Sequence, residues 1–279
     1  MRRFLSASCL LLVLACLTAT SPASAQSLPV SVNVSGETAT IVVGSASTPI
    51  ADLTLSFDDA SNLTAAGLGV SAQLVNPTDP SLLARLPAAT LTQLDSAFPL
   101  LITIEPTLAG GLSFERTVHV EVHTHNLPYT VGSSLRLFKA PLGGQFRDIS
   151  DEIAPGSVRA RGTTGGFSQF LVLADLRATD AVVAQKFAWL RAKVATVAVA
   201  ERASLDGYLD AAEDSVASGD HNAALLALDS FRARVSARAG IGIAQQWRAA
   251  RDLDNSAGEM LAGAATLKFS IAYLRDFGP

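Results

Sequence analysis

The residues best equipped for chemistry in this chain lie in one short stretch, 113–125, which reads SFERTVHVEVHTH. Three of the four histidines of the chain occur here, with a glutamate between the first two. Imidazole and carboxylate groups are the usual protein ligands of zinc, copper and nickel. The alternation of valine with polar residues is typical of a strand, which places His119, Glu121, His123 and His125 on one face. The stretch therefore predicts a metal site on a strand.

The geometry of a strand restricts which of these residues could share one ion. Side chains at positions i and i+2 stand roughly 7 Å apart, which allows two long side chains to converge on one ion. His119 and His125 are about 20 Å apart, so all four residues cannot ligate the same ion. We expect the set to be His123 and His125, completed by Glu121 or by a group from a neighbouring strand. The alternative is an ordinary sheet face, with valines inside and polar residues in water.

Such a strand needs a sheet around it, and residues 28–176 have the composition of one. Short runs rich in Val, Ile, Leu, Thr and Phe are separated by Gly, Pro, Asn and Asp, which mark turns. No alternating helix pattern indicates a parallel α/β domain. We predict an all-β domain over residues 26–176, an antiparallel β-sandwich of the immunoglobulin-like kind. Its expected strands cover residues 30–34, 38–43, 52–57, 69–75, 99–105, 113–124, 134–139, 156–161 and 167–174.

The rest of the chain is rich in alanine and predicts an all-α domain. Apolar residues three or four positions apart form four helical stripes. Four amphipathic helices joined by short turns predict an antiparallel helical bundle over residues 177–279, with Phe231 and Trp247 as its largest core side chains. The stripes cover residues 183–197, 205–216, 225–235 and 243–274.

The first 25 residues have the pattern of a secretory signal peptide. Two arginines precede a short apolar run, and Ala23-Ser24-Ala25 supplies the small residues that a signal peptidase accepts. We expect cleavage before Gln26 and export to the periplasm or the extracellular space. Residues 13–16, Val-Leu-Ala-Cys, leave a second reading open, in which Cys16 is the lipidated residue of a lipoprotein.

Cleavage would change the chemistry available to the mature chain. Both cysteines, Cys9 and Cys16, would be removed, which leaves no disulfide and no thiol ligand. Without Arg2 and Arg3, 19 basic residues face 25 acidic ones, a formal charge of −6. A mildly acidic chain without a basic stripe argues against nucleic acid as a partner. No second long apolar segment follows, so we expect no transmembrane anchor in the mature form.

Two resemblances to known modules involve particular segments. Residues 135–173, which contain LRLFKAPLGGQFRDIS and VRARGTTGGFSQFLVL, resemble the closing half of immunoglobulin-like or ZU5-like β-sandwich modules of bacterial secreted proteins. Residues 205–235 are similar to the FIMAH domain, a helical module at the C-termini of such proteins. That pattern pairs a Gly-Asp-x-x-Ala turn at Gly219 with Leu-x-x-Phe-x-x-x-Val at Leu228 and a later Gly240, although Ile241 replaces the usual basic residue.

These resemblances imply accessory modules without a catalytic site, and the whole arrangement resembles a domain-of-unknown-function family of secreted Gram-negative proteins. Ser168 does not lie in a Gly-x-Ser-x-Gly elbow and belongs to an expected strand. We therefore expect a non-catalytic exported protein, not an enzyme, which acts as a binding or structural module on an unknown protein or envelope component. Two alternatives stay open. One is a periplasmic metal-binding protein that holds a divalent transition metal on the histidine strand, and the other is a carbohydrate-binding or adhesive sandwich.

Overall fold

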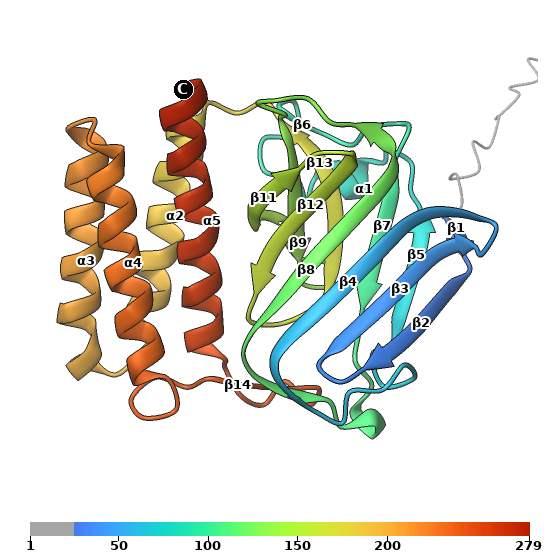
Figure 1. Cartoon of the computed structure of the whole chain (residues 1–279), viewed down its shortest axis with the longest axis horizontal. Coiled ribbons are helices and arrows are strands. Elements are labelled where there is room, and N and C mark those ends of the chain that lie inside the picture. Colours follow the sequence, from blue (N-terminus) through green and yellow to red (C-terminus); the bar gives the residue numbers. More distant parts are fainter. Residues whose placement is uncertain (1–24) are drawn as a thin grey trace, which may run out of the picture.

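The computed structural model describes residues 25–279, in which two β-sheets lie beside a layer of helices (Figure 1). The expected signal peptide and the expected lipidation of Cys16 fall outside these residues, apart from Ala25. All strand pairs of both sheets are antiparallel, and the sheets face each other in a sandwich-like arrangement. Within residues 25–279, none of the helices combines the length and the apolar character needed to span a bilayer.

The first sheet has its strands in the order β1-β5-β7-β13-β9-β10, and β6 pairs with β13 at one end. Five of its strands are three or more residues long, and the turn between β9 and β10 contains Gly143 with a positive φ of 69°. The strands are β1 (Gln26–Leu28), β5 (Val70–Leu74), β6 (Thr92–Gln93), β7 (Leu100–Ile104), β9 (Leu135–Ala140), β10 (Arg147–Asp148) and β13 (Gln169–Asp175).

The second sheet has the order β11-β12-β8-β4-β3-β2, and β14 pairs with the beginning of β8. Each of the nine expected strands overlaps a strand of the structure, and the strands that were not expected are β1, β6, β10, β11 and β14. Four of them have only two or three residues, too short to show a clear alternation, and β11 has five. The strands of this sheet are β2 (Val30–Ser35), β3 (Thr38–Ser45), β4 (Thr48–Ser61), β8 (Ser113–Pro128), β11 (Ser150–Ala154), β12 (Ser157–Thr164) and β14 (Gln246–Arg248).

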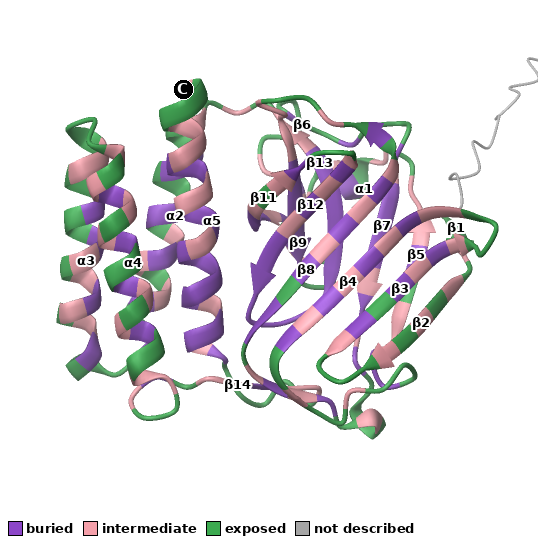
Figure 2. Cartoon of the chain, in the orientation of Figure 1, coloured by how far each residue is buried: buried purple, intermediate pink, exposed green. Residues whose placement is uncertain are grey.

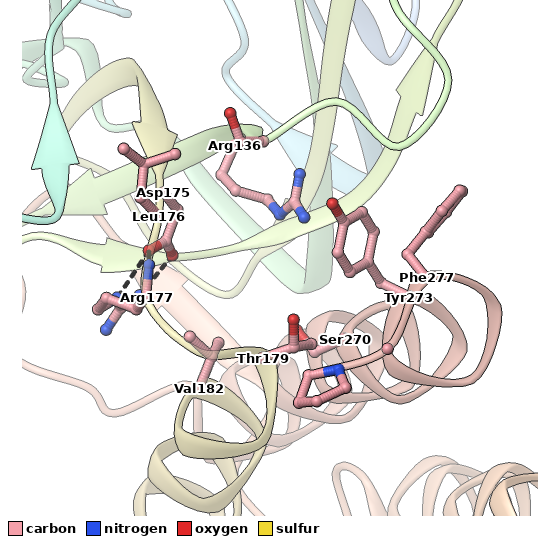
Figure 3. A pocket seen from close by; sticks show the side chains of 12 residues that line it. Arg136, Asp175, Leu176, Arg177, Thr179, Val182, Ser270, Tyr273 and Phe277 are labelled. Atoms are coloured by element: carbon pink, nitrogen blue, oxygen red, sulfur yellow. Dashed lines mark hydrogen bonds and ion pairs between the residues drawn. The ribbon is translucent and has the colours of Figure 1, made fainter.

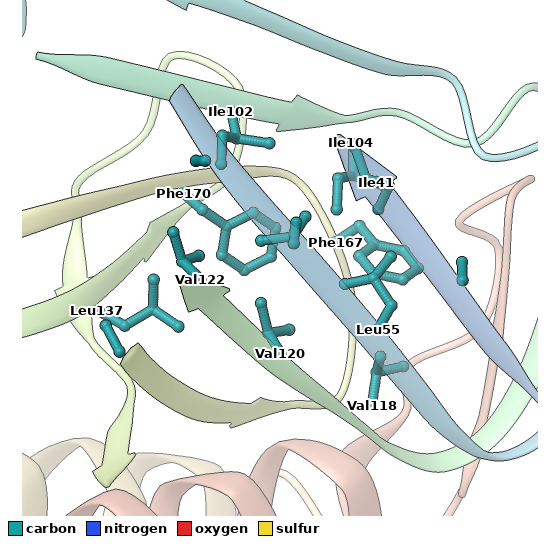
Figure 4. Close-up of a cluster of buried hydrophobic side chains, with 14 of the residues drawn as sticks. Ile41, Leu55, Ile102, Ile104, Val118, Val120, Val122, Leu137, Phe167 and Phe170 are labelled. Carbon is teal, nitrogen blue, oxygen red and sulfur yellow. The ribbon is translucent and has the colours of Figure 1, made fainter. Parts of the chain in front are cut away.

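Alternation along β8 builds the core between the two sheets. Val118, Val120 and Val122 are almost fully buried, and they face Ile102 and Phe170 of the first sheet (Figure 4). Figure 2 shows the same alternation of buried and more exposed residues along β4 and β8. Because successive side chains point to opposite faces, burial of the valines turns the histidines of β8 toward the outer face of the second sheet.

Four long helices pack beside one another and share a separate hydrophobic cluster, in which Phe187, Leu205, Phe231 and Leu267 are buried. α3 lies beside α4, and α5 lies between these helices and the sheets, where it contacts β8, β11 and β12 (Figure 1). The helices are α1 (Pro80–Leu83), α2 (Thr179–Val194), α3 (Val199–Ala217), α4 (His221–Arg238) and α5 (Ser256–Phe277), and a short 3-10 turn, η1, covers Leu108–Gly110.

The expected fourth helix, over residues 243–274, is wrong in its first half. Residues 246–248 form β14, and α5 begins only at Ser256. Trp247 lies in the core of the sandwich, stacked on Phe114 at 5.1 Å between ring centroids, and not in the helical cluster. The helical spacing of apolar residues extends through residues 243–255, but the helix begins only after Asn255. The side chain of Asn255 caps the helix by accepting a hydrogen bond from the backbone N–H of Gly258.

The same asparagine attaches α5 to the second sheet. Asn255 Nδ2 donates to the carbonyl oxygens of Arg116 (2.6 Å) and Gly165 (3.0 Å). A Cβ at Gly258 would lie 2.0 Å from the Arg116 carbonyl oxygen, so only glycine fits this close approach. Residues 177–279 thus contribute β14 to the second sheet as well as the four long helices. The boundary at residues 176 and 177, and a helical bundle that folds by itself, stay predictions.

Glu259, in the first turn of α5, joins the helix to the first sheet through partly buried ion pairs. Its carboxylate accepts from Arg147 Nη2 (2.7 Å) and Lys139 Nζ (3.3 Å). Burial alone would raise the pKa of Glu259, but the charges of Lys139, Arg147 and Lys193 outweigh it and lower the pKa to about 2. Burial lowers the pKa of Lys139 to about 8, so both partners are charged in neutral and acidic solution.

This pair should make the protein sensitive to acid. The pKa of Glu259 is about 2 in the folded state against 4.5 unfolded, so its stabilisation is complete above pH 4.5 and is lost as the pH falls toward 2. The total is about 3 kcal/mol, of which about 2 kcal/mol should be lost by pH 3. Urea unfolding at pH 6 and pH 3 measures this loss, and Glu259→Gln is the control because glutamine does not titrate. If the free energy of unfolding falls equally in the unmodified protein and in Glu259→Gln, Glu259 does not contribute to the acid sensitivity.

Candidate metal centre

The outer face of the second sheet carries the histidines of β8 between two neighbouring strands. Asp52 of β4 lies directly opposite His123, and Arg159 of β12 lies opposite it on the other side. His125 follows two residues further along β8 and points to the same face. The register of β4 and β8 therefore places one carboxylate beside two imidazoles.

These three side chains form a compact set of ligand atoms. Asp52 Oδ2 lies 3.0 Å from His125 Nε2 and 3.6 Å from His123 Nδ1, and the two imidazole rings are 4.5 Å apart between centroids. All three ligand atoms lie within 4.8 Å of one another. The side chains are partly exposed, so an ion could reach them from solvent. Among residues 25–279, this is the one group of three or more His, Cys, Asp or Glu side chains with such a spacing.

The electrostatic surroundings favour a neutral imidazole at His123. Burial is the main cause that lowers the pKa of His123 below its usual value, and the charges of Arg159 and His125 lower it further. The carboxylate of Asp52 acts in the opposite direction without reversing the shift. A neutral imidazole has a free lone pair for a metal, so no proton needs to be displaced from His123 near pH 7.

Glu121, the carboxylate expected to complete the set, is occupied by arginines. It accepts hydrogen bonds from Arg159 Nη1 (2.6 Å) and Arg161 Nε (2.5 Å). Burial alone would raise the pKa of Glu121, but these two guanidinium groups outweigh it and lower the pKa. Because both oxygens are used, Glu121 is not one of the three clustered ligands, and Asp52 takes that place.

His119 lies in another row of the same face, beyond Glu121. Its Nδ1 is 3.0 Å from the hydroxyl of Thr163, which donates to Asp151 Oδ2 at 2.5 Å. Burial raises the pKa of Asp151 above its usual value. A hollow of about 570 Å³ opens beside these residues, with His119, Glu121 and Asp151 in its lining. Metal binding by His119, Glu121, His123 or His125 stays a prediction.

The sequence pattern predicts His123 and His125 as ligands but does not point to Asp52. In the sequence, Asp52 is the first residue of an expected strand, and a strand next to the histidine strand could supply a ligand. The sequence does not show which strand lies beside β8 or in what register, because β4 and β8 are separated by β5, α1, β6, β7 and η1. Asp52 was therefore visible only as one of several acidic residues.

Comparison with known families places the chain as a whole. A family model described as a family of unknown function (DUF6689) matches residues 12–275. The chain belongs to DUF6689. The DUF6689 match spans both sheets and four complete helices, and it includes the three clustered ligands. The expectation of an uncharacterised family is thereby confirmed. No curated protein and no solved structure matches the chain.

Proposed function

We propose that this protein is an exported, non-catalytic binding module and that its ligand is a divalent transition-metal ion held by Asp52, His123 and His125. The observation that carries the proposal is the meeting of two imidazoles and a carboxylate from two neighbouring strands within 4.8 Å. Two nitrogen donors and one oxygen donor are typical of zinc and also suit copper and nickel.

The distances between the ligand atoms support this assignment. Ligands about 2.1 Å from a tetrahedral zinc ion stand about 3.4 Å apart. The separations of Asp52 Oδ2 from His123 Nδ1 and from His125 Nε2, 3.6 and 3.0 Å, lie on either side of that value. Both ligand strands belong to the centre of a sheet with a packed core, so small side-chain movements suffice to close the set. A fourth position stays open for water or for a group of a partner.

We also propose that the protein works at the bacterial envelope after export. The signal-peptide pattern of residues 1–25 supports export. The resemblances of residues 135–173 and 205–235 support an immunoglobulin-like or ZU5-like sandwich followed by a FIMAH-like helical domain. Two facing antiparallel sheets and a cluster of long helices agree with that arrangement.

Calorimetric titration of zinc chloride into protein that begins at Gln26 tests the metal site. We expect one ion per chain with a Kd below about 100 μM, since three preformed ligands exceed what an isolated surface histidine offers. The double substitution His123→Ala with His125→Ala should abolish this binding, and Asp52→Asn should weaken it at least tenfold.

His119→Ala is the matched control, because His119 lies on the same face of the same strand but outside the cluster. Its titration should equal that of the unmodified protein. Binding that survives the double substitution, or that His119→Ala removes, would refute the proposed ligand set.

A further inference from the structure

A second hollow lies between the first sheet and helices α2 and α5. Its volume is about 250 Å³, and its lining includes Arg136, Thr179, Val182, Ser270 and Phe277 (Figure 3). The lining combines two cationic side chains, Arg136 and Arg177, and the carboxylate of Asp175 with hydroxyl groups and apolar side chains. Such a mixture is typical of a site that binds a small polar molecule with an apolar part.

Arg136 is buried and, unlike Arg177, has no carboxylate partner among the described residues. Arg136 is only 7% exposed, and its guanidinium lies 4.4 Å from the ring centroid of Tyr273 and 5.0 Å from that of Phe269. Nη1 donates to the carbonyl oxygens of Ser133 (2.6 Å) and Leu135 (2.7 Å). Among residues 25–279, no carboxylate lies within ion-pair distance of Arg136.

The other donors of Arg136, on Nε and Nη2, make no hydrogen bond within residues 25–279. Within residues 25–279, the side-chain nitrogens that are both fully buried and without a hydrogen bond are Nε of Arg232 and Nε of Arg234. Nε and Nη2 of Arg136 are not among them, so these two atoms are accessible to solvent. Nε–H and one Nη2–H of a guanidinium point in the same direction, the arrangement that receives both oxygens of a carboxylate. Arg136 therefore offers an unused fork at the edge of the hollow.

The two nearby acidic side chains already have a cation each. Asp148 pairs with Lys186 at 2.6 Å, and Asp175 pairs with Arg177 at 2.6 Å. Counted over side chains alone, these four residues and Arg136 have a net charge of +1; Pro279 also lines the hollow, but its backbone carboxylate forms no ion pair with Arg136. Burial of an unbalanced charge is costly, and one bound anion of single charge would remove the imbalance.

We propose that the hollow binds a small organic carboxylate, with Arg136 as its anchor. The carboxylate accepts from Nε and Nη2 of Arg136. The hydroxyl of Ser270 accepts from Lys186 Nζ (2.8 Å), which leaves its own proton free to donate to the ligand. Val182, Leu176 and Phe277 form the apolar part of the lining, so the ligand carries a short apolar group. This inference is independent of the metal site.

Benzoate is a suitable probe, because it joins a carboxylate to a compact apolar ring. Titration of sodium benzoate into the purified protein, followed by nuclear magnetic resonance, should show saturable binding at one site. Benzamide, which has the same shape without the charge, should not bind up to 20 mM. Arg136→Lys keeps the charge but loses the fork, and it should weaken benzoate binding at least tenfold. Ser270→Ala should weaken it several-fold.

Arg191→Lys is the matched control, because Arg191 bonds carboxylates of α3 on the outer side of α2, and it should leave benzoate binding unchanged. Absence of saturable binding up to 20 mM would overturn the proposal, as would equal binding of benzamide. If Arg136→Lys fails to fold, unchanged binding in Ser270→Ala would overturn it. Tighter binding of inorganic phosphate than of benzoate would also overturn it, in favour of a phosphate site.

Discussion

Asp148→Asn should lower the free energy of unfolding by about 3–5 kcal/mol, because it leaves a buried ammonium without its counter-ion. Asp148 and Lys186 are 6% and 8% exposed, and Lys186 Nζ lies 2.6 Å from the Asp148 carboxylate. The remaining partners of Lys186 are neutral oxygens of Thr266 and Ser270. They can accept hydrogen bonds but cannot balance a charge. This pair joins β10 to α2, so its loss should loosen the contact between helices and sheet.

Urea unfolding at pH 7 measures this effect, and two further variants show its origin. The double substitution Asp148→Asn with Lys186→Met removes the uncompensated charge and should recover much of the lost stability. Asp252→Asn breaks an exposed pair with Arg248 and should cost less than about 1 kcal/mol. A loss in Asp148→Asn as small as that in Asp252→Asn would contradict the buried ion pair.

Trp247→Ala should cost about 3–5 kcal/mol, because it empties a position in the core of the sandwich. The indole is 7% exposed, stacks on Phe114 and meets Phe167 edge-on at 5.5 Å between ring centroids. Trp247 also belongs to β14, which extends the second sheet along β8. The substitution therefore measures how strongly a segment from the C-terminal region stabilises the sandwich.

Thermal and urea denaturation of Trp247→Ala and Trp247→Phe would measure this contribution. Phenylalanine keeps the aromatic contacts in part and should lose less than alanine does. Trp189, on α2, is the other tryptophan of the chain, so the tryptophan emission of the Trp247 variants comes from Trp189 alone and reports on the helices. A loss of less than 1 kcal/mol in Trp247→Ala would mean that β14 lies on the surface and not in the core.

The histidine strand shows how much a local pattern can predict. The alternation in residues 113–125 is sufficient to predict three features: the strand itself, the burial of Val118, Val120 and Val122, and the position of His123 and His125 on one face. The third ligand depends on which strand pairs with β8 and in what register. That information comes from contacts between distant segments, so Asp52 could be located only in the folded structure.

The C-terminal region shows where a local pattern fails. Apolar spacing predicted α2, α3 and α4, because their stripes face one hydrophobic cluster. The same spacing continued through Trp247, but there the large indole is buried against Phe114 of the sandwich, and tertiary packing outweighed the helical pattern. The cap at Asn255 was the available signal that a new helix begins there.

The most direct test of the metal site is to record the ring nitrogens of all four histidines by two-dimensional ¹H–¹⁵N nuclear magnetic resonance during a zinc titration. The structure predicts that the signals of His123 Nδ1 and His125 Nε2 shift together and saturate at one ion per chain, while those of His119 and His221 stay in place. In Asp52→Asn the same zinc concentrations should produce a much smaller shift. Equal shifts of all four histidines, or none at His123 and His125, would contradict a metal centre formed by Asp52, His123 and His125.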